Sequence, residues 1–140
     1  MISCTRRLSF SAGHRVAGHE NKCANLHGHN YTVEITAIAN ELDKLDRVID
    51  FSVLKEKIGG WIDSNIDHGF IISQEDGDVI KAISSITGSK LFIMPGSTTA
   101  ESIAKHLLED ICPMLLRDTN VKIIKVIVQE TENCKAEATL

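Results

Sequence analysis

The stretch YTVEITAIA, residues 31–39, alternates apolar with polar side chains and is rich in β-branched residues. One set of alternate positions holds Tyr31, Val33, Ile35 and Ala37, and the other begins with Thr32, Glu34 and Thr36. Successive side chains of an extended chain point to opposite faces, so this alternation predicts a β-strand with one apolar face.

Three further segments are predicted to form strands. Residues 2–10 follow a mostly two-residue alternation, which predicts the first strand of the chain. The segments VKIIKVIVQE, residues 121–130, and CKAEATL, residues 134–140, are separated by the polar tripeptide TEN. Because such polar residues favour turns, these segments predict a pair of strands at the end of the chain.

A first helix is predicted between the strand pairs. Asp50 can cap this helix, which runs to about residue 65, although Gly59 and Gly60 weaken it. Its apolar positions follow the helical period at Phe51, Leu54, Ile58, Trp61 and Ile62.

A second helix is predicted from a capping box made by Thr98 and Glu101, and it is predicted to end near Pro113. Its apolar stripe consists of Ile103, Ala104, Leu107, Leu108 and Ile111. The preceding segment, residues 67–96, is less regular, with a short helix indicated around Ile80 and Ile83 and an apolar LFIM near its end.

The predicted order of elements is therefore ββααββ. Strands at both ends with helices between them favour an α+β fold, with a four-stranded antiparallel sheet and two helices on one face. A chain of 140 residues can bury most of its apolar surface without disulfides. We therefore expect residues 1–140 to form a single domain.

The composition narrows the class of protein. Hydrophobic residues make up 43% and charged residues 24% of the chain, and the net charge of −4 argues against nucleic acid and favours a small-molecule partner. The N-terminus has no apolar signal region and no segment is long enough to span a membrane, so a cytoplasmic location is expected. The scattered cysteines, Cys4, Cys23, Cys112 and Cys134, are expected to be reduced.

A metal site is indicated by His27 and His29 in the stretch KCANLHGHNY, residues 22–31. In an extended segment their side chains point the same way, about 6.5 Å apart along the strand, and can converge on one ion. If the first two strands are antiparallel neighbours, His14 lies beside them as a third ligand. Three imidazoles and one open position are the usual ligands of catalytic zinc.

The residues alone leave two other interpretations open. His27 and His29 can be surface histidines at the start of a strand, or Cys23 can close the site as a fourth ligand and make it structural. In the catalytic interpretation a nearby dication favours the thiolate, which makes Cys23 a candidate base. His19 and His106 are expected to be solvent-exposed.

Three acidic or basic side chains elsewhere are also candidates. The Asp67 carboxylate can orient the His68 imidazole, whereas a histidine interacting with the end of a helix is the alternative. Glu130, beside Thr131, can bind a donor–donor edge of a heterocycle through both oxygens, and an exposed carboxylate at a strand end is the alternative.

Six motifs along the chain together resemble the 6-pyruvoyltetrahydropterin synthase and 6-carboxytetrahydropterin synthase family. The combination of SAGHR and CxxxHGHNY is specific, and the resemblance covers nearly the whole chain. The motifs are FSAGHR at 10–15, CANLHGHNY at 23–31, VIDFSVLK at 48–55, DH at 67–68, STTAESIA at 97–104 and QETEN at 129–133.

The resemblance implies a tunnelling fold, in which the sheets of three subunits join into a barrel and two trimers stack as a hexamer with active sites between subunits. It also implies a role for each candidate residue. The Zn²⁺ ligands would be His14, His27 and His29, the general base Cys23, the proton relay Asp67 and His68, and the pterin anchor Glu130 with Thr131 nearby.

The implied substrate is 7,8-dihydroneopterin triphosphate, from which triphosphate is eliminated. Carboxy-type members also cleave the side chain, which releases acetaldehyde and leaves 6-carboxy-5,6,7,8-tetrahydropterin, a precursor of queuosine. Pyruvoyl-type members stop earlier. The three residues between Cys23 and the HGH motif resemble the carboxy type. Arg15 and Lys22 are candidate triphosphate contacts, with exposed solvated charges as the alternative.

The chain departs from the family pattern in lacking an Asp-Pro turn before VIDF and in having a longer segment from Gly69 to Gly96. A non-catalytic protein that binds zinc or a pterin is the alternative of another class.

Overall fold

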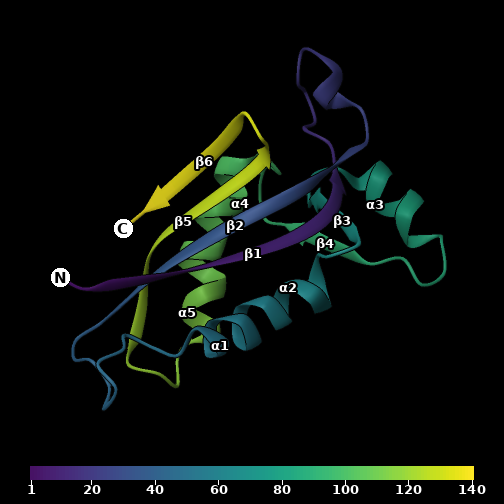
Figure 1. Ribbon diagram of the computed structural model, residues 1–140. Helices are drawn as coiled ribbons and strands as arrows, with labels where there is room; N and C mark the ends of the chain where they lie inside the picture. The colour runs from purple at the N-terminus through teal and green to yellow at the C-terminus, as the bar shows by residue number, and fades with distance from the viewer.

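The computed structural model describes residues 1–140 (Figure 1). The strands are β1 (Ser3–His14), β2 (His27–Ala39), β3 (Gly69–Ser73), β4 (Leu91–Met94), β5 (Val121–Thr131) and β6 (Cys134–Thr139). The α-helices are α1 (Phe51–Leu54), α2 (Gly60–Asn65), α3 (Gly77–Ser84), α4 (Ala100–His106) and α5 (Cys112–Leu115).

All strands form one mixed six-stranded sheet in the order β4-β3-β1-β2-β5-β6. The pairs β1–β2, β2–β5 and β5–β6 are antiparallel, whereas β3 is parallel to both β1 and β4. The four predicted strands are present as β1, β2, β5 and β6, and the α+β class is confirmed. The prediction of a four-stranded, wholly antiparallel sheet is wrong.

The two additional strands come from the segment between residues 69 and 96, which forms a β3–α3–β4 unit. Ile71 and Ile72 of β3 are adjacent in sequence and both are buried. Ile71 belongs to the main core, whereas Ile72 packs with Val79 and Ile83 of α3. A short strand buried on both faces shows no polar–apolar alternation, so its sequence pattern did not distinguish it from a loop or helix.

The first long helical segment agrees with its prediction. The helices α1 and α2 are joined by a π-helical turn, Lys55–Gly59, and together they span residues 51–65. The Asp50 carboxylate caps this segment by accepting a hydrogen bond from the Ser52 amide at 2.9 Å.

The second long helical segment begins later than predicted and ends at Leu115, close to the predicted end near Pro113. Thr99 caps α4, because its hydroxyl accepts a hydrogen bond from the Ser102 amide at 3.2 Å, so the assignment of the cap to Thr98 is wrong. A π-helical turn, Leu107–Ile111, leads into α5, which continues past Pro113. Pro113 is the second residue of α5, which begins directly after the π-helical turn.

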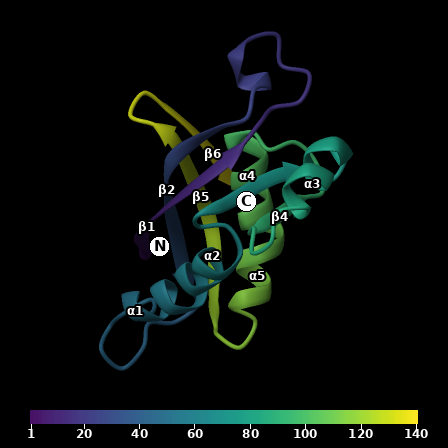
Figure 2. The same ribbon diagram turned by 90° about the vertical axis from the view of Figure 1, so that its right-hand side faces the viewer.

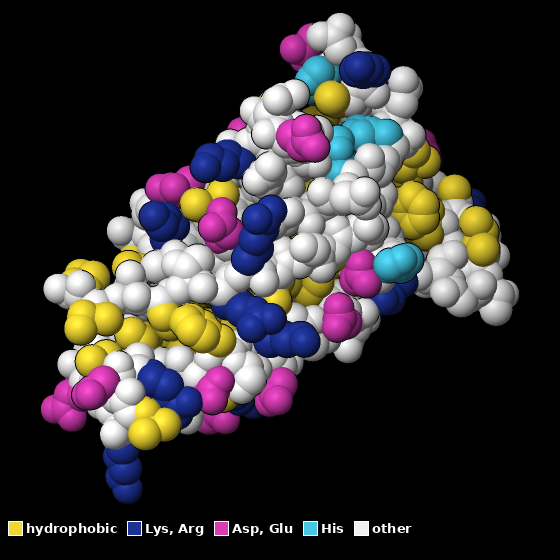
Figure 3. Space-filling model, viewed as in Figure 1, with side chains coloured by type: hydrophobic (Ala, Val, Ile, Leu, Met, Phe, Trp, Pro, Cys, Tyr) yellow, Lys and Arg dark blue, Asp and Glu magenta, His cyan; other side chains and the backbone are white.

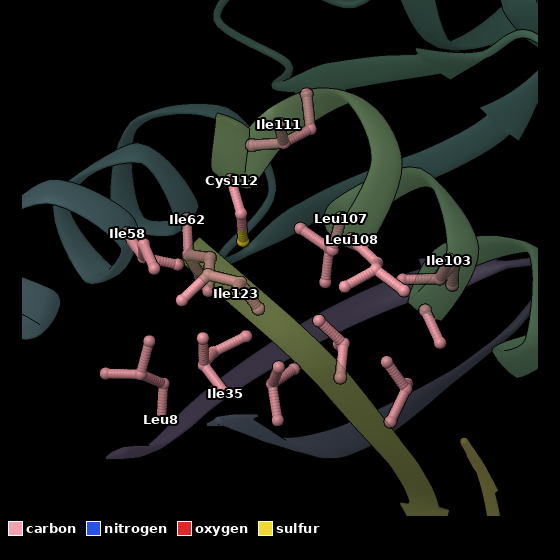
Figure 4. Close-up of a cluster of buried hydrophobic side chains, with 14 of the residues drawn as sticks. Leu8, Ile35, Ile58, Ile62, Ile103, Leu107, Leu108, Ile111, Cys112 and Ile123 are labelled. Atoms are coloured by element: carbon pink, nitrogen blue, oxygen red, sulfur yellow. The ribbon is translucent and has the colours of Figure 1, made fainter. Parts of the chain in front are cut away.

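The two long helical segments lie on one side of the sheet, as the views in Figures 1 and 2 show. Their apolar side chains, among them Ile62 and Leu107, point towards those of the strands, which include Ile35 and Ile123 (Figure 4). The predicted apolar face of residues 31–39 is buried in this core. No helix of the protein has the length and apolarity needed to cross a membrane.

Candidate functional site

Three histidines meet where β1 ends and β2 begins. The antiparallel pairing sets His14 directly opposite His27, and Ala12 opposite His29. Because alternate residues share a face, all three imidazoles lie on the side of the sheet that carries the core. Their ring centroids are 4.6–5.1 Å apart and one ring nitrogen of each lies within 4.8 Å of the others. The prediction that His14 joins His27 and His29 is confirmed.

The hydrogen bonds of these imidazoles leave nitrogen atoms free for a metal ion. His14 Nδ1 donates to the Thr98 carbonyl at 2.8 Å, and His27 Nδ1 to the Asn25 carbonyl at 2.6 Å. His14 Nε2 is buried and has no hydrogen-bond partner. Backbone carbonyls that accept from Nδ1 are the usual partners of metal-binding histidines, because they fix the tautomer in which Nε2 is the ligand.

Burial favours the neutral form of two of these histidines. It lowers the pKa of His14 from 6.5 to about 4, against the opposing effect of the Thr98 hydrogen bond, and it also lowers the pKa of His29. Neutral imidazole is the metal-binding form. The orphaned nitrogen, the hydrogen-bonded tautomers and the close approach of three rings therefore fit a divalent metal ion.

Thr98 connects this cluster to the start of α4. It is buried, and its hydroxyl donates to the Arg15 carbonyl at 2.8 Å while its own carbonyl accepts from His14. The Arg15 guanidinium forms two 2.6 Å hydrogen bonds with the Asp76 carboxylate and lowers the pKa of Asp76. From the sequence, Thr98 was expected only to cap a helix. Arg15, the candidate triphosphate contact, is paired with Asp76.

Glu130 lies on the same face of the sheet as the histidines. It is the penultimate residue of β5, and its Oε1 is 3.9 Å from His14 Nε2. Thr131 is exposed and is the last residue of β5, and its hydroxyl accepts a hydrogen bond from the Asn133 amide at 3.3 Å. Glu130 therefore reaches the histidine cluster, whereas the Thr131 hydroxyl binds the adjacent turn at Asn133.

Cys23 lies in a short 3₁₀ turn, Lys22–Ala24, in the loop between β1 and β2. It is half-buried and lines a cavity of about 200 Å³ together with Glu130 and Cys134. Its sulfur is not among the ligand atoms that gather within 4.8 Å of one another. This arrangement favours an open three-histidine site over one closed by Cys23.

Asp67 and His68 lie in the turn before β3, with Asp67 Oδ2 and His68 Nδ1 2.9 Å apart. The other Asp67 oxygen accepts from the Ser11 amide at 2.9 Å, and this bond is the main cause of its lowered pKa. His68 is 82% exposed and lines a surface cavity with Ser11 and Asn30.

Ser11 and Asn30 alternate with the histidine-bearing positions, so their side chains point to the opposite face of the sheet. The predicted relay pair therefore lies beside the face opposite the metal cluster. The open part of this face carries basic and acidic side chains interspersed with apolar ones (Figure 3).

Comparison with known proteins gives relatives over nearly the whole chain. Residues 3–139 match the family model described as 6-pyruvoyl tetrahydropterin synthase. A 6-carboxy-5,6,7,8-tetrahydropterin synthase from Rickettsia typhi is 48% identical, over 98% of this chain and 99% of the relative. A protein with the same name from Aquifex aeolicus is 34% identical, over 95% of this chain and 94% of the relative.

Solved structures share the fold. An uncharacterized protein from Wolinella succinogenes has a TM-score of 0.82 at 23% identity and covers 99% of this chain and 97% of its own. The 6-pyruvoyl tetrahydropterin synthase of Caenorhabditis elegans has a TM-score of 0.67 at 24% identity, with coverage of 99% and 95%. By its full-length match to the family model and its close relatives, the chain belongs to the 6-pyruvoyl tetrahydropterin synthase family.

Proposed function

We propose that residues 1–140 act as one pterin synthase domain, a zinc-dependent lyase of the carboxy type. It converts 7,8-dihydroneopterin triphosphate to 6-carboxy-5,6,7,8-tetrahydropterin, acetaldehyde and triphosphate, on the route to queuosine. The observation that carries the proposal is the cluster of His14, His27 and His29 with a buried, unpartnered Nε2. The names and full-length coverage of the relatives support the substrate class.

Zinc is the proposed metal, because a site of three neutral imidazoles with room for substrate is typical of catalytic zinc. When bound, the ion would polarise substrate oxygens and make neighbouring C–H and O–H groups more acidic. The hydrogen bond from His14 to Thr98 and that from His27 to Asn25 orient the rings before a metal arrives.

Cys23 and Glu130 are proposed to act on the same substrate molecule, Cys23 as the base and Glu130 as the anchor of the pterin. The cavity that both residues line supports this pairing. A carboxylate binds the amino-pyrimidine edge of a pterin well, since two acceptor oxygens face two donors. Thr131 would contact the pterin from the end of β5.

Asp67 and His68 are proposed as a proton relay that a neighbouring subunit supplies. They lie beside the sheet face opposite the histidine cluster, which argues against both groups acting on one substrate within a single chain. The sheet also has open edges suited to pairing between subunits, because β6 has one neighbour and β1 pairs with β3 only at Ala12–His14. We propose a homohexamer, built as a dimer of trimers, located in the cytoplasm.

Product analysis tests the proposed reaction. Purified zinc-loaded protein is incubated with 7,8-dihydroneopterin triphosphate and the products are identified by mass. The proposal predicts 6-carboxy-5,6,7,8-tetrahydropterin and acetaldehyde. Accumulation of 6-pyruvoyltetrahydropterin without acetaldehyde would instead assign the pyruvoyl-type activity named for the Caenorhabditis elegans protein.

Cys23→Ala separates an enzyme from a non-catalytic binding protein. The proposal predicts that this variant keeps its zinc and loses turnover, because the thiolate is the base and not a ligand. A closed structural site predicts the reverse for the metal, since one of four ligands would be lost.

A further inference from the structure

The Lys90 side chain joins two backbone segments that precede it by more than twenty residues. Its ammonium group donates to the Asp63 carbonyl at 2.7 Å and to the Asp67 carbonyl at 2.6 Å. Asp63 lies in the last turn of α2, where carbonyl groups lack helical partners and a positive charge is favourable. Lys90 therefore fixes the end of α2 to the turn that carries Asp67 and His68.

The backbone of Lys90 packs against the same turn. The Phe70 amide donates to the Lys90 carbonyl at 3.0 Å. A Cβ atom on Gly69 would lie 2.8 Å from the Lys90 carbonyl oxygen and 2.9 Å from Lys90 Cβ. This close approach requires glycine at position 69 and leaves little room for the turn to shift towards β4.

The strand β1 holds the turn from its other side. The His68 amide donates to the Ser11 carbonyl at 2.7 Å, and the Ser11 amide donates to Asp67 Oδ1 at 2.9 Å. His68 has a φ angle of 59°, in the left-handed region that non-glycine residues adopt only when their surroundings impose it. The turn is thus clamped between Ser11 and Lys90.

We propose that Lys90 is a positioning residue, which holds Asp67 and His68 in the orientation that transfers protons. This inference rests on the proposed role of that pair. The Lys90 ammonium binds backbone carbonyls, so it acts through the turn rather than on the substrate. The proposal also gives a function to the longer segment between residues 69 and 96, because this segment supplies Lys90.

Kinetics of matched variants test the proposal. Lys90→Met removes the donors and keeps the chain length, Lys90→Arg keeps the charge, and Lys81→Met removes the same charge from an exposed position on α3. We expect Lys90→Met to lower kcat about tenfold with KM changed less than about twofold, as for an interaction that acts in the transition state. Lys90→Arg should recover much of kcat, and Lys81→Met should resemble the wild type. Lys90→Gln replaces Lys90→Met if the latter does not fold.

A double-mutant cycle separates positioning from general stability. In a His68→Ala background, which retains the backbone amide but not the imidazole, Lys90→Met should lower the residual kcat by less than about twofold. An equal loss of kcat in both backgrounds, or no loss in either, would overturn the proposal.

Amide hydrogen exchange tests the role of Lys90 without any substrate. Lys90→Met should accelerate exchange of the His68 amide about tenfold and leave that of the core residue Ile35 unchanged. Unaltered exchange at His68 overturns the role of Lys90 even if the wild type has no activity on 7,8-dihydroneopterin triphosphate. Absence of wild-type turnover, by contrast, refutes the proposed function.

Discussion

His14 Nδ1 lies 2.8 Å from the backbone carbonyl oxygen of Thr98, a residue 84 positions later in the chain. This hydrogen bond links the end of β1 to the residue that precedes the cap of α4. It leaves the buried His14 Nε2 as the atom available to a metal ion. Thr98 is fixed in turn by its hydroxyl, which donates to the Arg15 carbonyl at 2.8 Å.

Thr98→Val should weaken zinc binding. The substitution keeps the shape of the side chain but removes the hydroxyl, so the carbonyl that orients His14 is held less firmly. Loss of the direct partner of a metal-binding histidine typically reduces metal affinity by about 10-fold to 100-fold, and because the Thr98 hydroxyl lies one contact further out, we expect a decrease of at most about 10-fold. Competition with a chromophoric chelator measures the affinity. Thr98→Ser, which keeps the hydroxyl, is the control, and equal affinities for the two variants would contradict the account.

His27→Ala should abolish stoichiometric metal binding, because it removes one of three ligands. Elemental analysis should give about one zinc ion per chain for the wild type and far less for the variant. His106→Ala is the matched control, since the His106 imidazole binds Asp110 at 2.8 Å outside the cluster. If His27→Ala still bound about one zinc ion per chain, His27 would not be a metal ligand and the proposed three-histidine site would be wrong.

The free energy of unfolding of the metal-free protein should fall as the pH is lowered below neutrality. Burial lowers the pKa of His14 from 6.5 to about 4. Between these values the unfolded chain binds a proton that the folded chain does not, so acid favours unfolding. The free energy of unfolding is therefore highest above about pH 6.5. The effect of His14 lowers it by about 3 kcal/mol as the pH falls to about 4.

Urea unfolding of the metal-free protein across this pH range measures the effect. His14→Gln has no titratable group at this position and should show a correspondingly shallower dependence of the free energy of unfolding on pH. Identical pH profiles for the two proteins would show that His14 does not titrate in this way.

His68→Gly should be more stable than His68→Ala. Both variants lose the imidazole, but only glycine adopts a φ of 59° without a steric penalty. The expected difference is about 1 kcal/mol in the free energy of unfolding, measured with denaturant. At the helical residue His106 the same pair should differ in the opposite direction, by about 1 kcal/mol. If the glycine variant were less stable than the alanine variant at position 68 as well, the backbone of His68 would not be strained.

The sequence predicted those elements whose residues share one regular pattern. The alternation at Tyr31, Val33 and Ile35 predicted β2, and the antiparallel return of the chain was enough to bring His14 beside His27. The strand β3 was missed because Ile71 and Ile72 are both buried, on opposite faces, and their segment has no alternation.

Contacts that support the site were missed for a different reason. The hydrogen bonds of Thr98 to His14, of Arg15 to Asp76 and of Lys90 to Asp67 join residues distant in sequence. Each depends on how β3, β4 and α4 pack against β1, which no local pattern specifies. The only signal for Thr98 in the sequence is the motif STTAESIA. There its hydroxyl was assigned to the helix cap, which Thr99 makes instead.

Release of acetaldehyde from 7,8-dihydroneopterin triphosphate, compared between metal-stripped and zinc-restored protein, tests the central claim most directly. The account predicts that the stripped protein releases no acetaldehyde and that one equivalent of zinc restores its release together with 6-carboxy-5,6,7,8-tetrahydropterin. Equal release without zinc, or substrate left unconverted by the fully zinc-loaded protein, would contradict it.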